Sequence, residues 1–265
     1  MSLHYTEQGN LTGEAILYLH GSGMAGWSWQ DVISRLPQYH NIAVDLPGHG
    51  ASHTIQAQTL NDMAQSVADF IVETIPNRKV HIVGLSLGGI ITLELLRYRP
   101  DLVTSAVVSG VNAIPLPFMT KLMVQLMMPL MKNDFFIRQN ASMFQLDDES
   151  SALYFDSMKQ LDMTTLKSIM PEIVNYSPAE QLRGIHVPIL FVAGNEEQNI
   201  NVESVALLAN AMEQAVGVLA PNMHHGWSGE NPVLFAEMIK KWIANKEIAS
   251  GLDVMVDKHQ QLVSG

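Results

Sequence analysis

The stretch Gly84-Leu85-Ser86-Leu87-Gly88-Gly89 follows the apolar run Val80–Val83 and opens the helical pattern Leu87–Tyr98. A G-x-S-x-G motif between a strand and a helix holds its serine in a strained tight turn, so that the hydroxyl stands clear of the sheet. Glycine is needed at positions 84 and 88 because a side chain there would collide with neighbouring backbone. We therefore predict that Ser86 is a nucleophile.

The sequence around this motif predicts an α/β fold with a mostly parallel, doubly wound sheet. Short apolar runs alternate with longer amphipathic segments, which is the pattern of a parallel sheet covered by helices on both faces. The candidate strands are Ala15–Leu19, Asn41–Leu46, Val80–Val83, Thr104–Ser109, Pro188–Ala193 and Ala215–Leu219. The candidate helices, which show apolar residues at helical spacing, are Leu60–Ile75, Leu87–Tyr98, Val202–Met212 and Pro232–Lys246.

The alternation stops between Val111 and Pro178, where only helical patterns occur. We expect residues 111–178 to form a helical insertion over the sheet, residues 1–110 and 179–247 to form the core, and residues 248–265 to form a C-terminal tail. The first insertion helix is rich in methionine, including Met119, Met123 and Met127. These side chains are either ordinary core or a pliable apolar pocket wall, and in the second case they favour a lipophilic substrate.

The composition excludes several classes of function. The 265 residues carry a formal charge of -11, which disfavours a nucleic-acid partner. There is no cysteine, so disulfides, a thiolate nucleophile and cysteine-bound zinc are absent. No metal-binding or nucleotide-binding motif and no stretch long enough to span a membrane occurs, so we expect no metal and no cofactor. The first residues do not resemble a signal peptide, and a cytoplasmic location is expected.

A second glycine-rich stretch, His20-Gly21-Ser22-Gly23, follows the first candidate strand. A loop at this place could bring a backbone N–H over the nucleophile, and two such donors hold a tetrahedral oxyanion. We assign the donors to Ser22 and Leu87, with Gly21 or Gly23 as alternatives to Ser22. We expect His20 to be structural, and Trp27, just after the loop, is a candidate pocket residue.

Together with Asp45-Leu46-Pro47-Gly48-His49-Gly50-Ala51-Ser52, these two motifs resemble the bacterial α/β-hydrolase superfamily, over nearly the whole chain from Leu3 to Lys246. The resemblance implies a catalytic acid after the strand Pro188–Ala193, a late histidine and a helical cap where the alternation stops. It also implies that Asp45 and His49 belong to a structural turn.

The resemblance also indicates the base and the acid. The stretch from His225 to Pro232 resembles the family's spacing between the catalytic histidine and the final helix, so His225 is the predicted general base and His224 its rival. The acid is expected three residues after Gly194, where this chain has Glu197 in place of the usual aspartate. Glu196 is the alternative.

The predicted function is a serine hydrolase that cleaves a carboxylic ester of a small, lipophilic molecule through an acyl-enzyme on Ser86. The same triad can also support a C–C bond hydrolase or a lyase, and a hydrolase-like receptor with little turnover is a further alternative. The sequence does not indicate an oligomeric state.

Overall fold

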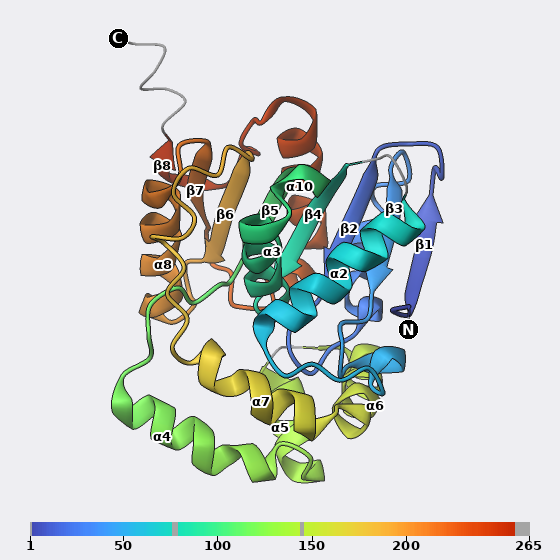
Figure 1. The fold of residues 1–265 in the computed structure, drawn as a ribbon, viewed down its shortest axis with the longest axis vertical. Helices are drawn as coiled ribbons and strands as arrows, with labels where there is room; N and C mark the ends of the chain where they lie inside the picture. Colours follow the sequence, from blue (N-terminus) through green and yellow to red (C-terminus); the bar gives the residue numbers. More distant parts are fainter. Residues whose placement is uncertain (1, 76–78, 144–145, 258–265) are drawn as a thin grey trace.

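The computed structural model describes residues 2–75, 79–143 and 146–257. Their main feature is an eight-stranded sheet with the strand order β1-β3-β2-β4-β5-β6-β7-β8 (Figure 1). Strands β2 to β7 pair in parallel, whereas β1 and β8 pair antiparallel with β3 and β7 at the two edges. The strands are β1 (Tyr5–Gly9), β2 (Ala15–Leu19), β3 (His40–Val44), β4 (Val80–Leu85), β5 (Val103–Ser109), β6 (Ile189–Gly194), β7 (Ala215–Ala220) and β8 (Asp253–Asp257).

Helices cover both faces of the sheet because successive strand residues point to opposite sides. On β2, Leu17 and Leu19 pack into the core under α2 and α3, whereas Ile16 and Tyr18 pack on the other face with side chains of α1 and α10. The helices outside the insertion are η1 (Gly26–Trp29), α1 (Gln30–Ile33), η2 (Gly50–Ser52), α2 (Leu60–Thr74), α3 (Leu87–Tyr98), η3 (Pro100–Leu102), α8 (Asn199–Ala211), α9 (Trp227–Glu230) and α10 (Pro232–Asn245).

The predicted α/β fold is confirmed, and two edge strands were missed. Strand β1 carries a mostly exposed, polar sequence and therefore has no apolar signal. Strand β8 lies inside residues 248–265, for which no element was predicted, and it adds to the sheet beside β7. Residues 253–257 of the expected tail therefore complete the sheet edge, whereas its residues 258–265 lie outside the described part of the chain.

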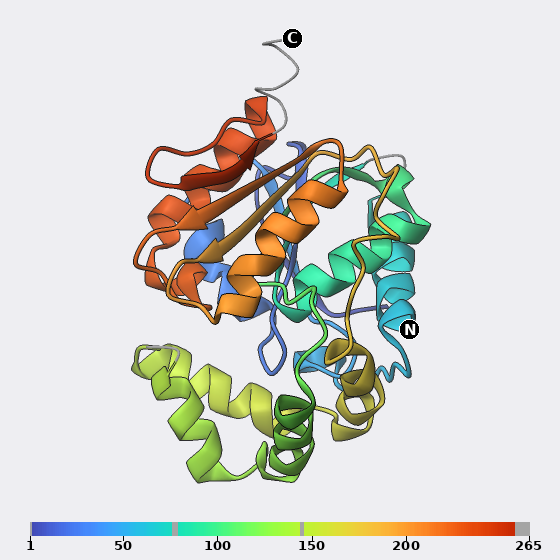
Figure 2. The same ribbon diagram turned by 90° about the vertical axis from the view of Figure 1, so that its left-hand side faces the viewer.

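Between β5 and β6 the described part of the chain contains only helices, which gather beyond one end of the sheet (Figure 2). They are α4 (Phe118–Met127), η4 (Met128–Leu130), α5 (Asp134–Met143), α6 (Asp148–Gln160) and α7 (Met163–Ile173). A small separate core joins α5, α6 and α7 to the loop after β2, through residues such as Ile137, Tyr154 and Met24. Within the ranges that the structure describes, no helix is long and apolar enough to cross a bilayer.

Candidate active site

Ser86 lies in the turn between β4 and α3 with a backbone φ of 53° and ψ of -113°. A positive φ is a strained conformation for a residue with a side chain, and it persists only where the surroundings enforce it. Here the Ser86 N–H donates to the carbonyl of Ser109 at 2.9 Å, and the Ser86 carbonyl accepts from Ile90 N–H at 3.0 Å. The end of β5 and the first turn of α3 therefore hold the strained residue in place.

The two motif glycines permit this turn because there is no room for side chains beside it. A Cβ atom on Gly88 would lie 2.0 Å from the carbonyl oxygen of Leu19, and one on Gly84 would lie 2.6 Å from the carbonyl oxygen of Gly88. Both contacts are with backbone, which cannot move aside cheaply. The motif is thus required by the close approach of β2, β4 and α3.

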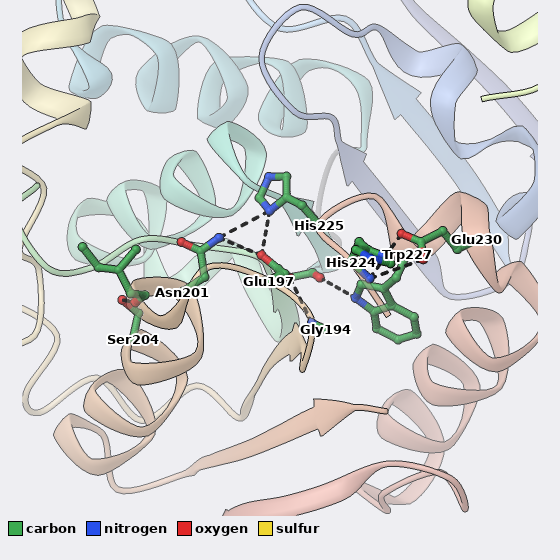
Figure 3. A network of polar contacts seen from close by, with 10 residues as sticks. Gly194, Glu197, Asn201, Ser204, His224, His225, Trp227 and Glu230 are labelled. Atoms are coloured by element: carbon green, nitrogen blue, oxygen red, sulfur yellow. Dashed lines mark hydrogen bonds and ion pairs between the residues drawn. The ribbon is translucent and has the colours of Figure 1, made fainter. Parts of the chain in front are cut away.

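Glu197 and His225 form a direct pair at the carboxyl ends of the strands. Nδ1 of His225 lies 2.7 Å from Oε2 of Glu197, whose side chain is fully buried, while the His225 side chain is 35% exposed. Since Nδ1 is engaged by the carboxylate, Nε2 is the imidazole nitrogen left for other partners. Figure 3 shows the imidazole directed at this carboxylate.

Asn201, on α8, is a polar partner of this pair that sequence reasoning missed. Its Nδ2 donates to Oε2 of Glu197 at 2.7 Å and lies 3.5 Å from Nδ1 of His225 (Figure 3). The backbone N–H of Gly194 donates to the other carboxylate oxygen at 2.9 Å. No local pattern pointed to Asn201, because Glu197 lies before the start of α8 and the two side chains meet only in the folded chain.

Burial and hydrogen bonding have opposite effects on the Glu197 carboxyl. Burial alone would raise the pKa of Glu197, but the hydrogen bond and charge of His225, together with the donors Asn201 and Gly194, outweigh it and lower the pKa. Glu197 is therefore ionised at neutral pH and can stabilise a protonated His225.

The two rival residues lie elsewhere. His224 is half-exposed, and its Nδ1 is 3.1 Å from Oε2 of Glu230. Glu196 is exposed, and its backbone N–H donates to the carbonyl of Met223. The pairing of acid and imidazole thus involves Glu197 and His225, at the positions that the resemblance implied.

Gly110 connects the His225 loop with the turn that holds Ser86. It follows Ser109, whose carbonyl accepts from Ser86, and it has a φ of 63°. A Cβ atom at Gly110 would lie 2.8 Å from Cε1 of His225. Trp227 adds a second link, since its buried indole N–H donates to Oγ of Ser109 at 3.0 Å. The turn that holds Ser86 and the loop that carries His225 therefore meet at the end of β5.

The loop after β2 lies against Ser86. A Cβ atom on Gly21 would be 3.7 Å from Cβ of Ser86. The backbone N–H groups of Ser86 and Gly88 donate hydrogen bonds to backbone carbonyls. The N–H of Leu87, between them, donates to no backbone carbonyl among the described residues. Oγ of Ser22 is buried and has no hydrogen-bond partner among the residues that the structure describes.

His20 and His49 are buried and hold backbone groups. Nε2 of His20 accepts from Leu46 N–H at 3.0 Å, so its Nδ1 donates to the Gly21 carbonyl at 2.8 Å. Burial lowers the pKa of His20. Burial, followed by the charge of nearby His20, lowers the pKa of His49 to about 3. Both imidazoles are therefore neutral and serve to shape the loops.

Asp45 is also structural. Its buried carboxylate accepts from the backbone N–H of Gly26 at 2.7 Å and from that of Ala51 at 2.9 Å. It thereby ties the turn after β3 to the start of η1.

A cavity of about 500 Å³ lies between the loop after β2 and helix α6, and its lining does not include Ser86, Glu197 or His225. Its lining includes Trp27, Leu85 next to Ser86, and Gly226 next to His225. The indole N–H of Trp27 donates to Oγ of Ser157 at 2.9 Å, which joins the loop to α6. Trp27 lines this cavity, and its role as a substrate-pocket residue stays a prediction.

The three methionines predicted to line the pocket do not lie there. Met119, Met123 and Met127 are exposed on α4 and are not part of the cavity lining. The prediction failed because methionine at helical spacing fits a core, a pocket wall and an exposed apolar face equally well.

Within the described ranges, no group of three or more acidic or histidine side chains is arranged to hold a metal ion.

The comparisons with known proteins agree with this fold. Residues 16–238 match the model of the Alpha/beta hydrolase family, and the chain belongs to that family. It is 26% identical over 254 residues, 93% of this chain and 86% of the relative, to an "AB hydrolase superfamily protein" of Gibberella zeae. It is 37% identical over 106 residues to the pimeloyl-[acyl-carrier protein] methyl ester esterase of Vibrio vulnificus, a match that covers 40% of this chain and 39% of that protein.

Solved structures support the same fold. A thermophilic esterase from Thermogutta terrifontis superposes with a TM-score of 0.77 at 20% identity, over 91% of this chain and 92% of that chain. This likeness shows the fold alone. The family and its relatives named as hydrolases and esterases support hydrolysis as the kind of chemistry.

Proposed function

We propose that the protein is a serine ester hydrolase in which Ser86 is the nucleophile, His225 the general base and Glu197 the acid that orients it. The observation that carries this proposal is the pairing of a buried, ionised Glu197 with His225 at 2.7 Å, at the end of β5 whose Ser109 carbonyl holds the strained Ser86. A serine hydroxyl is a weak nucleophile unless a base removes its proton. The pair supplies that base in the tautomer with Nε2 free.

The reaction proceeds in two steps. Ser86 Oγ attacks the ester carbonyl carbon while Nε2 of His225 takes its proton, and the protonated imidazole then passes that proton to the leaving alkoxide. An acyl-enzyme on Ser86 and a free alcohol result. In the second step His225 activates a water molecule that attacks the acyl carbon, which releases the acid and restores the serine.

The oxyanion of each tetrahedral intermediate needs preorganised donors. The backbone N–H of Leu87 opens helix α3 and has no role in the surrounding backbone bonds, and the positive end of the helix dipole adds to its effect. The backbone N–H of Ser22 is the second donor of the proposal. Its buried, unpartnered hydroxyl lies in the same loop and gains a partner when substrate binds.

The substrate class is inferred from the cavity lined by Leu85 and Gly226, the chain neighbours of Ser86 and His225. A space of about 500 Å³ suits a small molecule, and Met24, Trp27 and Leu85 give part of its wall an apolar character. Asp31 and Asp45 also belong to the lining, which contains no lysine or arginine. An uncharged ester therefore fits the cavity better than an anionic one.

The test is hydrolysis of p-nitrophenyl esters of increasing acyl length by the wild type and by Ser86→Ala. The wild type is expected to prefer short or medium acyl chains, and the variant to lose all measurable turnover. Labelling of the wild type, but not of the variant, by a fluorophosphonate is the parallel check. A wild type that labels yet cleaves no ester would contradict the ester substrate and favour a C–C bond hydrolase. A wild type that does not label would contradict the activated serine.

A further inference from the structure

Helix α4 turns its apolar side chains away from the protein. Met119, Met123 and Leu126 are 70%, 60% and 65% exposed, and Phe118 at its start is 77% exposed. Successive residues of a helix lie about 100° apart, so these side chains form one continuous stripe. A surface helix of a water-soluble protein normally shows the reverse arrangement, with its apolar stripe against the core.

The opposite side of α4 faces α7. Lys121, Val124, Gln125 and Met128 line a groove of about 520 Å³ together with residues of α7 such as Lys167. Nζ of Lys121 donates to Oδ1 of Asn175, just after α7, at 2.6 Å. The side of α4 that faces the rest of the molecule therefore mixes polar and apolar residues, whereas the strongly exposed apolar stripe has no covering in this structure.

The position of α4 leaves this stripe free to meet a flat surface. Figure 1 shows α4 along the end of the long axis opposite the C terminus, and Figure 2 shows the same end free of the sheet. The 3₁₀ turn η4 continues the exposed edge with Leu130, and Phe135 of α5 is 77% exposed beyond it. Contiguous apolar surface of this kind on a soluble protein marks an interaction site.

The charges of this segment indicate the partner. Residues 113–133 include Lys121 and Lys132 but no aspartate or glutamate, in a chain whose net charge is -11. Nζ of Lys132 donates to the carbonyl of Lys159 at 2.8 Å, so both ammonium groups are bonded to uncharged oxygens, while Asp134, which follows this segment, pairs with Lys159. At physiological salt the screening length is about 8 Å, so a surface that touches α4 senses these lysines more than the distant acidic groups.

We propose that α4 and η4 lie in the headgroup region of a phospholipid bilayer that contains anionic lipid, with the apolar stripe inserted among the acyl chains. An amphipathic helix with basic residues on the face opposite its apolar stripe binds membranes in this way. A second copy of the chain fits less well, because a two-fold contact through α4 would bring together two molecules that each carry a net charge of -11.

The experiment is co-sedimentation of the full chain with vesicles of phosphatidylcholine alone and with vesicles that also contain phosphatidylglycerol. The wild type is expected to sediment with the anionic vesicles and to be released by high salt. The double variant Met123→Glu, Leu126→Glu is expected to lose at least tenfold in bound fraction. The matched control is Leu11→Glu, Val233→Glu, which alters exposed apolar residues outside α4 and is expected to bind as the wild type does.

All these substitutions are at exposed positions, so the variants are expected to fold, which circular dichroism would verify. Ser86→Ala is expected to bind the anionic vesicles as the wild type does, since membrane binding does not depend on the reaction. Absence of wild-type binding to anionic vesicles, or equal binding of the α4 variant, would overturn the proposal. A wild-type dimer that the α4 variant converts to a monomer, without vesicle binding, would assign the stripe to contacts between copies instead.

Discussion

Nδ2 of Asn201 lies 2.7 Å from Oε2 of Glu197, and the same carboxylate oxygen lies 2.7 Å from Nδ1 of His225. One oxygen therefore accepts from both a fixed amide and the imidazole. Because Asn201 belongs to the first turn of α8, the helix restrains a carboxylate that stands on a longer side chain than aspartate. The extra methylene of Glu197 is thus accommodated by the start of a helix.

Asn201→Ala is expected to lower kcat by about tenfold with little change in KM, because the carboxylate loses one restraint while the cavity is unaltered. The steady-state kinetics of ester hydrolysis would measure this, with Asn199→Ala, on the same helix, as the control. A change confined to KM would contradict a positioning role.

Glu197→Gln is expected to lower kcat by about 10² to 10⁴, as removal of the acid does in other serine hydrolases. The amide cannot stabilise the protonated His225, although it fills the same space. Circular dichroism and the melting temperature would establish that the variant is folded. Retention of full activity would show that another group orients His225.

Gly110→Ala is expected to abolish most of the activity, because the new Cβ would lie 2.8 Å from Cε1 of His225 and displace the ring. The matched control is Gly184→Ala, since Gly184 also has a positive φ, of 81°, but has no atom within 4 Å of an added Cβ. Both variants carry the backbone strain, of about 1 kcal/mol. Only Gly110→Ala is expected to lose turnover, and equal activities would contradict the steric argument.

Two buried serines are expected to respond in opposite ways. Ser22→Ala removes an unpartnered hydroxyl, so the free energy of unfolding is expected to stay unchanged while kcat/KM falls about tenfold. In Ser52, Oγ accepts from His4 N–H at 2.9 Å, so Ser52→Ala is expected to cost about 1 kcal/mol of stability and leave turnover intact. Urea unfolding and ester kinetics on both variants test the pair. A Ser22→Ala variant with full activity would remove the hydroxyl from the site.

The buried neutral His49 predicts a loss of stability in acid. Its folded pKa is about 3 against 6.5 for the ordinary imidazole, so between these values the unfolded chain binds a proton that the folded chain does not. The contribution is therefore fully present above pH 6.5 and is lost as pH falls, by about 1.4 kcal/mol per unit on the steep part. Urea unfolding at pH 7.5, 6 and 5 would measure it. His49→Gln is expected to reduce this dependence without abolishing it, because burial also lowers the pKa of His20. An unchanged dependence in His49→Gln would contradict the prediction.

The sequence predicted those parts of the fold that have apolar periodicity. Six strands were found within two residues of their ends because their side chains are buried on both faces. Strand β1 was not predicted because Thr6, Glu7 and Gln8 face solvent. Its position in the sheet is set by backbone pairing with β3. Pairing of this kind depends on a partner distant in the sequence and leaves no local pattern.

The candidate site divides in the same way. Ser86 and the glycines around it could be predicted because backbone geometry restricts the residue types, and the acid and histidine positions followed from a resemblance. Asn201 could not be predicted, because an amide side chain on a helix is as often exposed to solvent as it is part of a site. The methionines of α4 were misplaced for a related reason: periodicity identifies an apolar face but does not say what covers it.

The antiparallel strands β1 and β8 cover the two edges of the parallel sheet, which affects how molecules of this protein associate. Strand β7 is a run of six apolar residues, Ala215–Ala220, which as an open edge would recruit strands from other molecules. Strand β8 occupies that edge, and its own sequence begins and ends with aspartate, a poor template for further pairing. A chain cut before Asp253 would keep the serine, histidine and glutamate of the site and yet be prone to stack edge to edge into aggregates.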